Sequence, residues 1–147
     1  MSRAKDILDR SKEFVVTPDT QRIILALDMK RLKTPSGIDK TVVEQKGDRQ
    51  GGCYELAGSF VIGMRGRSNK DWLLIHAFIN PPLGPLQGTN YDHAWCEKGN
   101  IVYEPVFNNF YVKADYHKAY EPKNVKKYSE QDARQALIRY ETWGPWE

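Results

Sequence analysis

Residues 92–106 read DHAWCEKGNIVYEPV and predict a β-hairpin, because two strand-like runs flank a short Lys-Gly-Asn turn. If the chain turns at Lys98-Gly99, His93 lies directly across from Glu104. If it turns at Gly99-Asn100, the register moves by two residues and the pair meets only diagonally, across about 7–8 Å. Either register keeps both side chains on one face of the hairpin. The sequence therefore predicts a histidine beside a carboxylate.

A carboxylate next to an imidazole has a defined chemical use. By accepting a hydrogen bond from one ring nitrogen, Glu104 would fix the tautomer of His93 and leave the other nitrogen free to take a proton from a nucleophile. Trp95 shares this face and is expected to pack under the histidine. The pattern therefore calls for a nucleophile elsewhere in the chain.

Cys53 is the candidate nucleophile. It opens a predicted helix in which apolar residues recur at helical spacing, namely Cys53, Leu56, Ala57, Phe60, Val61 and Met64, with Gly63 and Gly66 marking its end. Free N–H groups and the positive dipole end at a helix start stabilise a thiolate and can hold an oxyanion. Gly51 and Gly52 leave room for a substrate backbone. Because the apolar stripe must pack on the sheet, we expect the thiol to face it.

The remaining segments predict one α+β domain over residues 1–147, with helices packed on an antiparallel sheet. Residues 72–79 predict a buried strand and 109–117 a further one, and loops 80–91 and 107–117 are the expected substrate walls. Further helices are expected at 2–14, from Pro18 to about Leu32 and from Ser129 to Tyr140. A short buried strand at 23–27 is the alternative to the second of these helices. Residues 34–52 are expected to form an irregular connection that holds at most a brief strand at 41–43.

Composition excludes several classes of protein. With 40% hydrophobic residues the 147-residue chain can bury one core, but it holds no apolar run long enough for a membrane span and begins without a secretory signal. Two cysteines are too few for a disulfide scaffold, so we expect a cytoplasmic protein. The net charge of +3 does not favour a nucleic-acid partner, and the lysine clusters at 30–33 and 123–127 are interpreted as solvated faces.

The other candidate residues have simpler interpretations. Cys96 points away from His93 and is expected in the core, as is His76, which could also lie at the edge of a cleft. His117 carries no signal, and the aromatic residues Tyr140, Trp143 and Trp146 are expected to anchor the C-terminal tail. A structural zinc site would need four ligands from Cys53, His76, His93 and Cys96, but strand alternation sends His93 and Cys96 to opposite faces, so no metal and no cofactor is expected.

The segments GCYELA at 52–57 and HAWCEKGNIVYEPV at 93–106 resemble the transglutaminase-like branch of the papain-like cysteine enzymes. The resemblance implies a papain-like fold in which Cys53 is the nucleophile, His93 the base, and Glu104 fills the position usually held by aspartate before Pro105. It leaves the second oxyanion donor unassigned.

The resemblance implies a thiol hydrolase, such as a thiol protease or amidase, or a transglutaminase or deamidase type of transferase, acting on protein or peptide amide bonds. The alternative is a catalytically inactive transglutaminase-like scaffold that serves as a protein-binding module.

Overall fold

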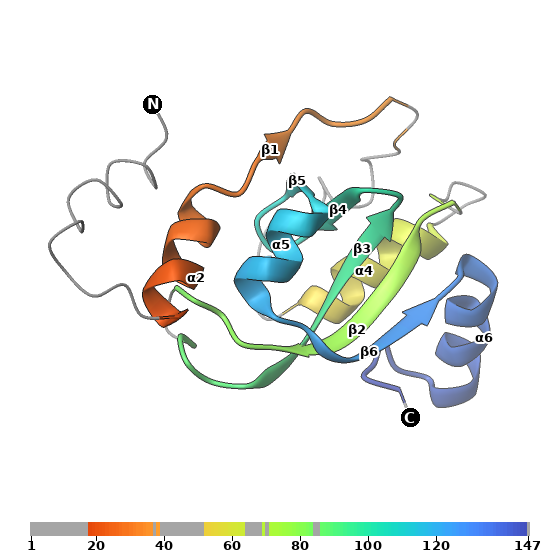
Figure 1. The fold of residues 1–147 in the computed structure, drawn as a ribbon. Coiled ribbons are helices and arrows are strands. Elements are labelled where there is room, and N and C mark those ends of the chain that lie inside the picture. Colours follow the sequence, from red (N-terminus) through yellow and green to blue (C-terminus); the bar gives the residue numbers. More distant parts are fainter. Residues whose placement is uncertain are drawn as a thin grey trace, which may run out of the picture.

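The computed structural model describes residues 18–36, 38, 52–63, 69, 71–83 and 86–146, with the side chains of 18–20 excepted. The fold is α+β (Figure 1). Within the described residues it has one antiparallel sheet of six strands, accompanied by four helices. The elements in chain order are α2 (Pro18–Leu27), β1 (Arg31–Leu32), α4 (Cys53–Ile62), β2 (Leu73–Ile79), β3 (Tyr91–Lys98), β4 (Ile101–Glu104), β5 (Asn109–Val112), α5 (Lys113–Tyr120), β6 (Lys123–Tyr128) and α6 (Glu130–Tyr140). The strand order is β1-β5-β4-β3-β2-β6.

The sheet is covered on both faces (Figure 1). Helices α4 and α6 pack on one face, where β3 contributes Ala94 and Cys96 to the core. Helix α5 packs on the other face against Trp95 and Val102, and α2 lies against α5. This two-sided burial explains why β2 reads as a nearly continuous apolar run.

The β3–β4 hairpin turns at Gly99-Asn100, the second of the two predicted registers. Cys96 pairs with Tyr103 and Lys98 with Ile101, so the two remaining residues form the turn. Gly99 has a φ of 56°, a left-handed conformation that costs glycine little. As a result His93 and Glu104 are diagonal neighbours rather than directly opposed residues.

Helix α4 begins at Cys53 and ends at Ile62, as its apolar stripe predicts. Leu56, Ala57, Phe60 and Val61 are all buried against the sheet, because their 3–4 residue spacing puts them on one side of the helix. Gly63 follows with a φ of 74°, and its N–H donates to the Ser59 carbonyl. The expected stripe residue Met64, and Gly66, lie outside the described residues.

Three predicted elements differ in the structure. Helix α2 ends at Leu27 instead of about Leu32, because Arg31 and Leu32 pair with β5 as a strand. The predicted strand 109–117 continues only to Val112, and α5 follows at once with Tyr116 and Ala119 buried. The loop expected at 107–117 is therefore reduced to the turn that precedes β5.

Strand β6 has no counterpart among the predicted strands. It forms one edge of the sheet beside β2 and is exposed along almost its whole length. Its sequence is therefore rich in lysine and lacks the alternation of apolar and polar residues by which a strand is predicted. After it, Ser129 caps α6 by accepting from the Asp132 N–H, as expected. The predicted helix 2–14 and most of the connection 34–52 lie outside the described residues.

None of the helices within the described residues is long and apolar enough to cross a membrane.

Candidate active site

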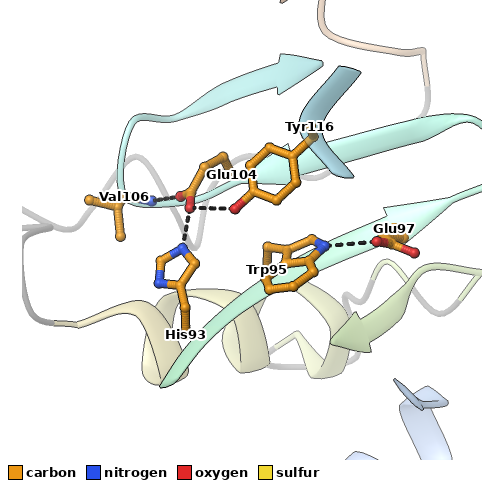
Figure 2. A network of polar contacts seen from close by, with 6 residues as sticks. All are labelled: His93, Trp95, Glu97, Glu104, Val106 and Tyr116. Carbon is orange, nitrogen blue, oxygen red and sulfur yellow. Dashed lines mark hydrogen bonds and ion pairs between the residues drawn. The ribbon is translucent and has the colours of Figure 1, made fainter. Parts of the chain in front are cut away.

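His93 and Glu104 form a buried pair between β3 and the end of β4. Nε2 of His93 is hydrogen bonded to Oε1 of Glu104, and the two residues are only 5% and 2% exposed (Figure 2). The register makes them diagonal neighbours, a separation that long side chains can span. Glutamate has one methylene more than aspartate, and that extra length fits the diagonal geometry.

Cys53 lies half-buried at the first residue of α4 and interacts with the same histidine ring. A side-chain hydrogen bond between Cys53 and His93 is among the causes that raise the pKa of His93. Because Nε2 is occupied by Glu104, Nδ1 is the ring nitrogen left for the thiol. Figure 2 shows the start of α4 running beside His93.

The contact between Cys53 and His93 depends on the unequal lengths of two strands. Strand alternation puts His93 on the face opposite to Ala94, whereas α4 packs on the face of Ala94. Strand β4 ends at Glu104, level with Trp95, while β3 continues to Tyr91. His93 therefore lies beyond the paired part of β4, where the edge of β3 is open to the start of α4.

The charge state of His93 follows from its two neighbours. Burial by itself lowers the pKa of the ring, but the charge of Glu104 and the hydrogen bonds with Cys53 and Glu104 outweigh burial and raise the pKa to about 10. The ring is therefore an imidazolium at neutral pH. A cation in contact with a thiol favours the thiolate, which is the reactive form of cysteine.

Glu104 is held by two further donors. The backbone N–H of Val106 donates to Oε2 at 2.8 Å, and the Tyr116 hydroxyl donates to Oε1 at 3.2 Å (Figure 2). These hydrogen bonds satisfy the buried oxygens of Glu104 and so offset the cost of removing them from water.

Tyr54, Tyr91 and Asp92 surround the Cys53–His93 contact. The Tyr54 hydroxyl donates to Asp92 Oδ2 at 2.8 Å, and the Tyr91 ring lies 5.9 Å from the His93 ring. Burial, followed by the charges of Glu104 and Cys53, raises the pKa of Tyr91 to about 12. Asp92 is exposed.

A second histidine and carboxylate pair joins α5 to β3, and the sequence interpretation missed it. The buried carboxylate of Glu97 contacts His117 Nε2 at 2.7 Å, Lys113 Nζ at 3.3 Å and the Trp95 indole N–H at 2.8 Å. His117 reaches Glu97 because residues 113–120 form a helix rather than the expected strand. The sequence does contain one indication of this pair: Glu97 lies on the same strand face as His93 and Trp95, so its carboxylate is expected to need a partner on that face.

The two remaining candidates lie in the core, as predicted. Cys96 is fully buried, its thiol donates to the Ala57 carbonyl at 3.3 Å, and burial raises its pKa well above the usual range. His76 is enclosed by Tyr54, Tyr128 and Trp146, and burial, followed by the charge of Lys126, lowers its pKa to about 4. Neither residue reaches the His93 pair.

Within the described part of the chain, no group of three or more histidine, cysteine, aspartate or glutamate side chains could hold a metal ion.

No protein-family model, curated protein or solved structure matches this chain.

Proposed function

We propose that the protein is a cysteine-dependent acyl-transfer enzyme in which Cys53 is the nucleophile, His93 the general base and acid, and Glu104 the residue that orients the histidine. One observation carries the proposal: the imidazole of His93 is hydrogen bonded to a buried carboxylate, and the thiol at the start of α4 lies close enough to the same ring to raise its pKa. This is the arrangement that nucleophilic catalysis by cysteine requires.

The reaction begins with the proton of the Cys53 thiol on His93, so that the thiolate and the imidazolium form an ion pair. The thiolate attacks the carbonyl carbon of an amide or ester and forms a C–S bond. His93 then donates its proton to the leaving amine or alcohol, the bond to that group breaks, and a thioester remains on Cys53. Water or an amine attacks the thioester, His93 takes the proton of the attacking group, and Cys53 leaves as the thiolate.

The start of α4 supports the oxyanion of the tetrahedral intermediate. Leu56 N–H already donates to the Gly52 carbonyl, and Gly52 has no side chain with which to cap the helix. Because Gly52 places no side-chain cap on the helix, we infer that the backbone N–H of Cys53 donates to the substrate oxygen. The positive end of the helix dipole acts in the same direction.

The substrate class comes from the resemblance to transglutaminase-like and papain-like enzymes rather than from the geometry. We infer a protein or peptide amide as the acyl donor, with hydrolysis or transfer to an amine as the two possible outcomes, in the cytoplasm. An inactive scaffold of the same fold, used to bind a protein partner, is the competing function. It predicts an unreactive Cys53 and tolerance of Cys53→Ser.

An activated acyl ester tests the proposal, because it needs no knowledge of the natural substrate. Intact-mass spectrometry after brief exposure should find one added acyl group, and peptide mapping should locate it on Cys53. Cys53→Ala should abolish the adduct, whereas the matched control Cys96→Ala should keep it. An adduct that forms equally well without Cys53, or no adduct at all, would refute the enzyme and favour the scaffold.

A further inference from the structure

The carboxylate of Glu104 accepts a hydrogen bond from α5 as well as contacting His93. Tyr116 is fully buried, and its hydroxyl donates to Oε1, the same oxygen that contacts His93 Nε2 (Figure 2). Val106 N–H occupies Oε2. Within the described residues, three donors thus fix both oxygens and leave the carboxylate little freedom to rotate.

The tyrosine is itself held rigidly. Its ring packs on Trp95 with centroids 5.3 Å apart and stacks on Tyr120 at 4.6 Å. Trp95 in turn stacks on His93 at 6.0 Å, so one aromatic row runs from the histidine to α5.

Helix α5 is tied to β3 on either side of Tyr116. Lys113 and His117, three residues before and one residue after it, both contact the buried carboxylate of Glu97. Since residues three and four apart share a helix face, these contacts turn the face that carries Tyr116 toward β3. Helix α5 therefore presents the hydroxyl at a fixed position.

We propose that Tyr116 is a positioning residue that acts on His93 through Glu104, and that α5 is in this way part of the catalytic apparatus. The effect of Tyr116 on catalysis rests on the proposed function, whereas its effect on the position of Glu104 and His93 does not. Tyr116 shares Oε1 with His93 and so limits how strongly the carboxylate holds the imidazolium proton. Glu104 holds the Nε2 proton, whereas the proton for the leaving group comes from Nδ1. An imidazolium that the carboxylate stabilises too strongly is a weaker acid and releases its Nδ1 proton less readily.

Nuclear magnetic resonance of the His93 ring at neutral pH tests this without any substrate. The chain has only three histidines, so protein labelled with ¹⁵N-histidine gives an assignable spectrum. In Tyr116→Phe the His93 Nε2–H proton should move downfield, because it becomes the only side-chain donor to Oε1. Replacing Tyr116 by 3-fluorotyrosine, which keeps the shape and donates more strongly, should move it upfield and serves as the second variant should the phenylalanine protein fail to fold.

Tyr120→Phe is the matched control, since its ring stacks on Tyr116 while its hydroxyl is not among the donors to Glu104. Its Nε2–H resonance should match that of the parent. If Glu104 moves away from the ring in Tyr116→Phe, the Nε2–H signal should be lost. That loss would also show that Tyr116 positions Glu104 against His93.

A resonance that is unchanged in both Tyr116 variants would overturn the proposal. If the Nε2–H shift occurs but no acyl adduct forms on Cys53, the positioning role stands and the proposed function fails. If the Nε2–H shift occurs and the acyl adduct forms on Cys53, acylation by the activated ester should slow about tenfold or less in Tyr116→Phe, as expected for one charged hydrogen bond.

Discussion

His93 meets Glu104 along a diagonal of the β3–β4 hairpin rather than straight across it. The longer side chain of glutamate spans this offset, and an aspartate at the same backbone position would end about one bond short. We therefore expect Glu104→Asp to slow acylation of Cys53 about tenfold or more, which corresponds to about 1.4 kcal/mol of lost orientation. Stopped-flow measurement with the activated ester checks this, with the exposed Glu55→Asp as control. An aspartate variant as fast as the parent would mean that Glu104 does not orient His93.

The His93–Glu104 pair should make stability depend on pH in the alkaline range. The pKa of His93 is raised in the folded protein from its ordinary 6.5 to about 10. The stability it contributes is fully present below about pH 6.5 and is lost as the pH rises through about 10. We expect urea unfolding to show that the parent's advantage over His93→Gln shrinks between pH 6 and pH 10. A constant difference between the two proteins across that range would contradict the ion pair.

Glu97 should give the opposite dependence. Burial alone raises its pKa, but the hydrogen bonds from His117 and Trp95 and the charges of His117 and Lys113 outweigh it, so the pKa is lowered. Its stabilisation is present above about pH 4.5 and is lost as the pH falls through the lower folded pKa. We expect Glu97→Gln to cost about 2 kcal/mol at pH 7 and less in acid, by urea unfolding. Equal losses at both pH values would show that the charge is not what matters.

The C-terminal tail should stabilise the α4 face of the sheet. Trp146 is 3% exposed and packs on His76 and Tyr128, with ring centroids 5.0 and 5.1 Å away. Trp146→Ala should reduce the free energy of unfolding by about 3 kcal/mol, because it removes a large buried ring. The control Ile138→Ala, at a residue that is 74% exposed, should change it by less than about 0.5 kcal/mol. Similar effects of both substitutions on urea unfolding would mean that the tail does not anchor the fold.

The predictions that the structure confirms rest on local patterns. The stripe after Cys53 fixes the start of α4, and strand alternation puts His93 and Glu104 on one face whichever residues form the turn. The choice between the two registers could not be made from the sequence, because Lys98-Gly99 and Gly99-Asn100 are both acceptable turns.

The features that the sequence could not supply are those set by distant contacts. The approach of Cys53 to His93 requires β4 to end before the level of His93, and no local pattern determines that difference in strand length. The contributions of Tyr116 and His117 depend on α5, a helix of weak amphipathic pattern that sequence reading assigns to a strand. Packing on Trp95 overrides that preference.

The relative reactivity of the two cysteines tests the central claim most directly. At about pH 6 a mild alkylating agent should modify Cys53 first, because an imidazolium adjoins its thiol, while the thiol of Cys96 is fully buried with a raised pKa. Mass spectrometry after partial reaction counts the label at each site, and His93→Gln should remove most of the advantage of Cys53. Equal and slow labelling of Cys53 and Cys96 in the parent, or fast labelling of Cys53 that does not depend on His93, would contradict the account.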